Sequence, residues 1–216
     1  MKKKMIKRAL GTMVLAMMVL GWAEPSAAAA LSANDLTDVR RAEDYMNGLT
    51  SLKARFLQVN NGGSTAEGTV WLSRPGKMRL EYDPPNPLLV VADGTFLIVH
   101  DAELDDPSYI PLESTPAGVM LRPKIALNSG DLKVTEVERD AGVISFKIIN
   151  AEEPEQGDLT LTFTERPFLL RQWTVRDVQD KYTTVSLFDV QSGIEIDLKK
   201  FVFENPKFKQ HQLPLR

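Results

Sequence analysis

Residues 68–94 constrain the fold of this 216-residue chain more than any other stretch. Within this stretch, residues 77–83 alternate strictly, with Met78, Leu80 and Tyr82 separated from one another by charged residues. Strict alternation of apolar and polar residues is typical of a β-strand with one apolar face and one solvated face. We therefore predict a strand at residues 77–83.

The residues on either side of this strand predict a meander of antiparallel strands. Arg74-Pro75-Gly76 is a turn signal before it, and Asp93-Gly94 is a hairpin signal after it. The prolines at positions 84, 85 and 87 cannot continue a ladder because they lack the N–H donor. The predicted meander comprises residues 69–73, 77–83, 88–91 and 95–99.

The rest of the chain predicts one N-terminal helix, one short helix and further strands. Ser32 or Asn34 can cap a helix whose apolar residues recur at three- and four-residue spacing up to Asn47-Gly48. Thr115 and Pro116 are residue types that begin a helix, here an apolar one too short to be stable alone. Between residues 100 and 111 the chain is acidic and predicts an irregular loop. Further strands are predicted at residues 52–59, 133–138, 142–149, 159–165, 170–178, 182–190 and 194–200.

One long helix and many antiparallel strands predict a mainly β fold of the α+β class. Because the strands carry apolar residues on one face, a strongly curved open sheet wrapped around a helix fits the pattern. A closed barrel with a packed core fits it equally well, and the pattern alone does not separate the two.

Residues 1–30 predict a secretory signal peptide. Five basic residues precede an uncharged apolar core, and the small residues at positions 27–30 offer a cleavage site. The apolar core is about 13 residues long, short of the roughly 20 that span a bilayer. We therefore expect an exported protein with one domain at residues 31–206 and a polar tail at residues 207–216.

The exported chain is predicted to be acidic, and the sequence contains no cysteine. Removal of residues 1–30 takes away five of the 26 basic residues and one of the 29 acidic residues, which leaves a net charge of about −7. This charge argues against a nucleic-acid partner, which needs a clustered basic surface. The lack of cysteine excludes a disulfide framework and a lipid anchor on a cysteine.

The sequence holds few of the residues that catalysis requires. It has two histidines, no cysteine nucleophile, and no Gly-x-Ser-x-Gly or His-x-x-x-His pattern. Glu67, Glu81 and Asp83 are carboxylates of the type that glycosidases use. On solvated strand positions, such carboxylates far more often pair with neighbours such as Lys77 and Arg79. We therefore predict no enzymatic activity and no cofactor.

A series of short motifs runs through most of the predicted domain. In order they are Gly68, Trp71-Leu72, Arg74-Pro75, Met78-Arg79, Tyr82-Asp83, Pro85, Leu89-Val90, Ala92-Asp93-Gly94, Thr115-Pro116, Val119-Met120-Leu121, Phe201-Val202-Phe203 and Asn205-Pro206. In this order and spacing they resemble the LolA family of periplasmic carriers of outer-membrane lipoproteins. The related LolB receptors are themselves lipoproteins, so a chain without cysteine resembles the soluble carrier.

The resemblance implies an open half-barrel that covers an apolar cavity for the acyl chains of a lipoprotein. It implies a lid of short helices over that cavity, where the plain alternative is a crossover segment packed on the core. The lid residues would be Thr115, Pro116, Val119, Met120 and Leu121, with residues 125–127. We expect the cavity to be lined by Val70, Leu72, Met78, Leu80, Tyr82, Leu89, Val91, Leu161, Phe163 and Trp173.

Arg74 breaks the apolar pattern, because it has the same parity as Val70 and Leu72. By pattern alone, either the strand has ended and Arg74 reaches water, or a charged donor lies at the rim of an apolar concavity. The resemblance implies the second arrangement, with Arg74 as a latch that holds the lid closed by hydrogen bonds to its backbone.

The resemblance also implies partners. They are an acylated lipoprotein as cargo, an inner-membrane ABC lipoprotein exporter of the LolCDE type that loads it, and an acceptor that is either a LolB-type receptor or the outer membrane itself. It implies a monomer in the periplasm of a Gram-negative cell. A function of a different class remains open, namely a periplasmic sensor or regulatory module that binds lipid or peptide with the same fold.

Overall fold

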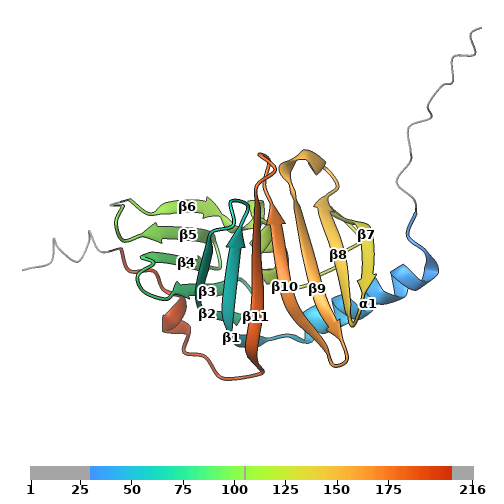
Figure 1. Cartoon of the computed structure of the whole chain (residues 1–216), viewed down its shortest axis with the longest axis horizontal. Coiled ribbons are helices and arrows are strands. Elements are labelled where there is room, and N and C mark those ends of the chain that lie inside the picture. The colour runs from blue at the N-terminus through green and yellow to red at the C-terminus, as the bar shows by residue number, and fades with distance from the viewer. Residues whose placement is uncertain (1–29, 105, 206–216) are drawn as a thin grey trace, which may run out of the picture.

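The computed structural model describes residues 30–104 and 106–205, which form one antiparallel sheet of 11 strands with two α-helices (Figure 1). The helices are α1 (Ala33–Gly48) and α2 (Pro116–Leu121), with short 3-10 helices η1 (Leu112–Ser114), η2 (Pro154–Gln156) and η3 (Leu198–Phe201). The predicted signal peptide up to residue 29 and the predicted polar tail lie outside the described residues.

The strands are β1 (Ser51–Asn60), β2 (Thr65–Ser73), β3 (Lys77–Tyr82), β4 (Leu88–Asp93), β5 (Phe96–Asp101), β6 (Ser108–Pro111), β7 (Leu132–Asp140), β8 (Val143–Asn150), β9 (Asp158–Glu165), β10 (Phe168–Arg176) and β11 (Tyr182–Ser192). Strands β1–β6 form one meander, strands β7–β11 form a second, and the pairing of β1 with β11 joins them. The edge strands β6 and β7 do not pair with each other, so the sheet is open. The open-sheet prediction is confirmed, and the closed-barrel alternative is wrong.

The N-terminal helix α1 begins where the sequence predicts. The Ser32 hydroxyl accepts a hydrogen bond from the Asp35 amide at 3.1 Å, and the Asp35 carboxylate accepts one from the Ser32 amide at 2.9 Å. This reciprocal capping box satisfies two backbone donors that a helix end leaves free. The apolar stripe of α1 is buried against the second meander, and Figure 1 shows α1 crossing β8–β10. Asp35 and Asp38 also connect the start of α1 to the second meander, because both form ion pairs with Arg139 of β7.

The strand predicted at residues 194–200 is wrong. The chain leaves the sheet at Gly193, and residues 198–201 form η3, in which the Asp197 carboxylate caps the Lys199 amide at 2.9 Å. The alternation of apolar and charged residues here has no ladder to join, because β11 already pairs with β1 and β10. The segment instead crosses the face of the sheet that points away from α1 and α2, which we call the outer face. There the Lys200 carbonyl accepts a hydrogen bond from Arg79 at 3.1 Å.

The loop predicted between residues 100 and 111 contains a strand that the sequence did not indicate. Strand β6 is four residues long and pairs with β5, with Tyr109 opposite Ile98 and Ile110 opposite Leu97. Its residues are all exposed and it ends at Pro111. A strand this short, with acidic residues before it and proline at its end, has no periodicity that sequence analysis detects.

Candidate functional site

The apolar surface predicted as a cavity lining lies on the side of the sheet that faces α1 and α2, which we call the inner face. Seven of the predicted residues lie on it and belong to one buried cluster: Val70, Leu72, Met78, Leu80, Leu161, Phe163 and Trp173. Tyr82 is half-buried and packs against the same cluster. These residues come from β2 and β3 in one meander and from β9 and β10 in the other, so the fold brings both halves of the sheet to one surface.

Two predicted lining residues, Leu89 and Val91, lie on the opposite face, so this part of the prediction is wrong. In the pairing of β3 with β4, Leu80 lies opposite Val90 while Arg79 lies opposite Val91. Directly opposed residues of an antiparallel pair point to the same face. Val90 and Ala92 therefore take the inner positions, and Leu89 lies beside the C-terminal segment on the outer face.

The inner face is packed with protein side chains. The seven cluster residues are only 0–7% exposed. An internal hollow large enough for water would leave accessible surface on the residues around it, so these exposures mean that the face is filled. Met120 and Leu121 of α2 and Ile125 and Leu127 of the following loop are part of the filling. A ligand could therefore reach the inner face only if some of these side chains moved away from it.

The segment predicted as the lid is a short helix held close to its neighbours. The Thr115 hydroxyl accepts a hydrogen bond from the Gly118 amide at 3.1 Å and thereby caps α2, as its sequence predicts. Gly118 allows α2 to approach η1, because a Cβ at this position would lie 2.1 Å from the Leu112 carbonyl oxygen. Met120 and Leu121 are 1% exposed, whereas Pro116 and Val119 are half-buried. The helix therefore presents one apolar side to the inner face.

Residues 122–131, which follow α2, are fixed to α1 by contacts that the sequence analysis missed. The Asn47 side chain donates to the Ile125 carbonyl at 2.8 Å and accepts from the Ile125 amide at 2.9 Å. The Glu43 carboxylate accepts from the Leu127 amide at 2.6 Å. The sequence pattern indicates Asn47 only as the end of α1. Its 78-residue separation from Ile125 left no signal in the sequence of either segment.

Arg74 lies where the end of α1 meets the end of α2. Its Nη2 donates to the Arg122 carbonyl at 2.5 Å and its Nη1 lies 3.5 Å from the Leu49 carbonyl oxygen. Burial lowers the pKa of the Arg74 guanidinium. Next to it, the Gly76 amide donates to the Leu121 carbonyl at 2.9 Å. The turn between β2 and β3 is thus hydrogen-bonded to the carbonyls of Leu121 and Arg122 at the C-terminal end of α2.

Tyr82 is a polar group on the inner face, and it yields a pH prediction. Its hydroxyl donates to Gln58 Oε1 at 2.6 Å, and its ring meets Phe56 edge-on at 5.1 Å. Burial raises the pKa of Tyr82 to about 12. The folded state keeps a proton that the unfolded state loses near pH 10, so the free energy of unfolding falls as pH rises from about 10 to 12, by up to about 2 kcal/mol.

An absorbance titration at 295 nm checks this prediction. Burial also raises the pKa of Tyr45, so the late part of the titration has two contributors. Tyr82 should ionise near pH 12, and the Tyr82→Phe variant should lack that component while the contribution of Tyr45 stays. If Tyr82→Phe left the alkaline end of the titration unchanged, burial of this hydroxyl would not be the cause.

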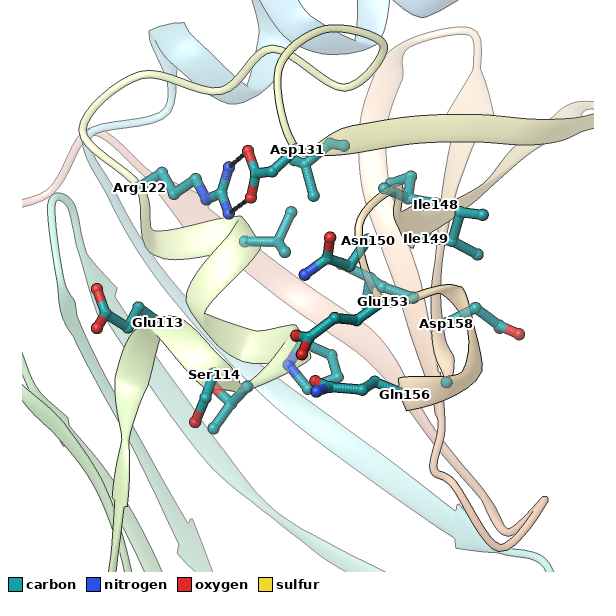
Figure 2. A pocket seen from close by; sticks show the side chains of 16 residues that line it. Glu113, Ser114, Arg122, Asp131, Ile148, Ile149, Asn150, Glu153, Gln156 and Asp158 are labelled. Carbon is teal, nitrogen blue, oxygen red and sulfur yellow. Dashed lines mark hydrogen bonds and ion pairs between the residues drawn. The ribbon is translucent and has the colours of Figure 1, made fainter.

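Two grooves flank α2. The first, which we call the α2–η2 groove, has a volume of about 210 Å³ and lies between α2 and the η2 region (Figure 2). The second, which we call the turn groove, has a volume of about 900 Å³ and is lined by Pro75, Gly76 and Lys77 of the β2–β3 turn, by Gly94 and Thr95 of the β4–β5 turn, and by α2 residues Gly118 and Leu121. Both grooves reach residues of the buried cluster, so α2 is a narrow cover with solvent on both sides.

Within residues 30–104 and 106–205, no group of three or more His, Asp or Glu side chains is placed to hold a metal ion. The helices in the same ranges are all too short or too polar to cross a bilayer. The three carboxylates considered for catalysis all form ion pairs. Glu81 pairs with Arg79 of the same strand, and Glu67 and Asp83 both pair with Arg55 of β1.

Comparison with known proteins identifies sequence relatives along most of the chain. The model of the family described as "Outer membrane lipoprotein carrier protein LolA" matches residues 47–204. An outer-membrane lipoprotein carrier protein from Chromohalobacter salexigens is 30% identical over 188 residues, which cover 77% of this chain and 82% of that protein. One from Pseudomonas aeruginosa is 26% identical over 211 residues, which cover 92% of this chain and 96% of that protein. The crystal structure of a LolA superfamily protein from Nitrosomonas europaea aligns with 81% of this chain and 99% of that chain, with a TM-score of 0.46 and 10% sequence identity.

Proposed function

The chain belongs to the LolA family of outer-membrane lipoprotein carrier proteins, and on that premise we propose that it carries lipoproteins across the periplasm. Its inner face binds the acyl chains of a lipoprotein released from the inner membrane and shields them until delivery to the outer membrane. The observation that carries this proposal is one continuous apolar surface, built from both meanders and covered by the short helix α2.

The free energies favour a carrier with a movable cover. Burial of one CH₂ group contributes roughly 0.8 kcal/mol, so an acyl chain of ~16 carbons contributes on the order of 12 kcal/mol. Exposing Met120 and Leu121 by lifting α2 costs about 1.5–3 kcal/mol for each side chain. A single acyl chain therefore outweighs the loss of the α2 contacts, and the inner face can exchange its own filling for cargo.

Arg74 is the latch in this proposal. A hydrogen bond from a charged donor contributes about 1.5–3 kcal/mol, far less than one acyl chain. The bond to the Arg122 carbonyl therefore does not drive transfer. It stabilises the closed, empty state, which lowers the net affinity for cargo and favours release.

The partners follow from the carrier function. We propose that an inner-membrane ABC exporter of the LolCDE type loads the cargo and that a LolB-type receptor or the outer membrane itself accepts it. The chain acts by binding, and the relatives named as carriers support a function without catalysis. The predicted signal peptide supports export to the periplasm, where the protein acts as a monomer.

The test is the cargo content of the protein purified from the periplasm under mild conditions. We expect native mass spectrometry to show a bound triacylated lipoprotein. Met78→Glu should reduce the bound fraction by at least about tenfold, because a charge on the inner face opposes burial of acyl chains.

The matched control is Lys53→Glu, which introduces the same residue at an exposed position of β1 and should keep the cargo. Circular dichroism must show that both variants are folded before their cargo is compared. A cargo-free protein that also fails to remove lipoprotein from inner-membrane vesicles containing the exporter would contradict the carrier function and favour the sensor alternative.

A further inference from the structure

Along β1 the inner face changes from apolar to polar. The side chains of β1 that point to this face are, in order, Leu52, Ala54, Phe56, Gln58 and Asn60. The first three belong to the buried cluster, whereas the last two are half-buried. The apolar stretch begins beside the latch, because the Arg74 amide donates to the Thr50 carbonyl at 2.8 Å. It ends at Gln58.

Four polar side chains form a continuous series of hydrogen bonds at this end, which we call the polar row. The Tyr82 hydroxyl donates to Gln58 Oε1 at 2.6 Å, and Gln58 Nε2 donates to Asn60 Oδ1 at 3.0 Å. Asn60 Nδ2 in turn donates to Ser64 Oγ at 3.1 Å, in the turn between β1 and β2. The polar row therefore runs from β3 across the inner face to the surface, and each of its members bonds to the next.

The distance between the latch and the polar row suits one acyl chain. Leu52 and Gln58 are six residues apart on an extended strand, which corresponds to roughly 20 Å. The hydrocarbon core of a bilayer is about 30 Å thick and contains two leaflets, so one acyl chain spans about 15 Å. The C-terminal end of α2 is hydrogen-bonded beside Arg74, so a chain that enters under a raised α2 starts at this end. Its last carbons then approach the polar row.

We propose that the polar row is the far limit of the acyl-chain site and makes the carrier selective for chain length. The inference rests on the proposed carrier function. Each CH₂ group buried on the apolar stretch raises the affinity about fourfold. A chain that extends past Gln58 must separate it from Tyr82, and a buried hydroxyl without its acceptor costs about fivefold or more in affinity. The gain from additional carbons therefore stops at the polar row.

A series of synthetic lipopeptides tests the proposal. Each has a single saturated acyl chain of 10 to 20 carbons on the amino group of an S-methylated cysteine, followed by four serines and a C-terminal amide. Affinities are measured by calorimetry below the concentration at which the lipopeptides aggregate. We expect the affinity to rise about fourfold per CH₂ group up to about 16 carbons, and less than about 1.5-fold per CH₂ group beyond that length.

The fluorescence of Trp173 reports how deep the chain lies. Trp173 and Gln58 both lie opposite Val185 of β11, so they are at the same level of the inner face. After removal of residues 1–30 the only other tryptophan is Trp71, which lies on the outer face under Lys200. A bromine atom on the last carbon of the acyl chain quenches a tryptophan that it contacts. Quenching of Trp173 should reach its maximum at the chain length where the affinity stops rising.

A double variant assigns the limit to the polar row. Gln58→Met/Tyr82→Phe keeps the approximate shape of both side chains and removes the hydrogen bond between them. We expect it to bind the 20-carbon lipopeptide about tenfold more tightly than the unsubstituted protein does, with less than twofold change for the 12-carbon lipopeptide.

The matched control is Gln172→Met/Tyr109→Phe. Gln172 accepts a hydrogen bond from Ser186 at 3.0 Å on the outer face, and Tyr109 is exposed on β6. This control should leave the dependence on chain length unchanged, and both variants must be folded by circular dichroism.

The outcomes separate this inference from the carrier function. If no lipopeptide of the series bound, the carrier function itself would be wrong. Binding that strengthened steadily up to 20 carbons in the unsubstituted protein would leave the carrier function intact and overturn the limit. A plateau that stayed at the same length in Gln58→Met/Tyr82→Phe would also overturn the assignment to the polar row.

Discussion

Replacing Gly68 by alanine is expected to lower the free energy of unfolding by about 3 kcal/mol or more. Gly68 lies in β2, opposite Phe56 of β1 and Tyr82 of β3. A Cβ at this position would lie 2.1 Å from the Glu81 carbonyl oxygen and 2.7 Å from the Phe56 ring. Because the nearest atom belongs to the backbone of β3, a side-chain rotation cannot relieve the contact, and β2 and β3 must separate.

Urea denaturation measures this effect. We expect the midpoint to fall by about 1 M or more with little change in the slope. The control is Gly62→Ala in the β1–β2 turn, where an added Cβ has no atom within 4 Å. Equal stability of the Gly68→Ala variant and the unsubstituted protein would contradict the close approach of β2 and β3.

The sequence predicts a strand's inner face only where polar residues mark its outer face. In β3, charged residues separate Met78, Leu80 and Tyr82, and the structure puts Met78 and Leu80 in the buried cluster with Tyr82 against it. Residues 88–92 of β4 are all apolar, because η3 and the C-terminal segment cover the outer face there. The sequence of β4 therefore does not define which residues point inward, and the predicted inner positions Leu89 and Val91 are wrong.

Local signals predicted the ends of helices, but long-range contacts left no trace in the sequence. Ser32 and Thr115 cap α1 and α2 as their residue types predict. The bonds of Glu43 and Asn47 to residues 125–127 depend on the final position of α1 relative to the α2 loop. The predicted strand at residues 194–200 is wrong for the same reason, since long-range pairing is not visible in a local pattern. Alternation is a property of one segment, whereas a strand also needs a neighbouring strand to pair with, and β11 already pairs with β1 and β10.

The latch gives the largest expected effect on transfer. We expect Arg74→Leu to slow the release of cargo to acceptor membranes by about tenfold or more, with loading preserved. Removal of the bond to the Arg122 carbonyl destabilises the closed, empty state by about 1.5–3 kcal/mol and leaves acyl-chain burial unchanged. Transfer of a labelled lipoprotein from the carrier to outer-membrane vesicles measures the rate.

Two further variants show whether the effect belongs to the latch geometry. Arg171→Leu is the same substitution at an exposed position of β10 and should release cargo at the normal rate. Arg74→Lys keeps the charge but replaces the planar fork, which reaches toward the carbonyls of both Leu49 and Arg122, with a single ammonium group. An intermediate rate for Arg74→Lys would show that both carbonyls matter, because charge alone would restore release fully. Unchanged release in Arg74→Leu would mean that the closed state is held by Met120 and Leu121 without the latch.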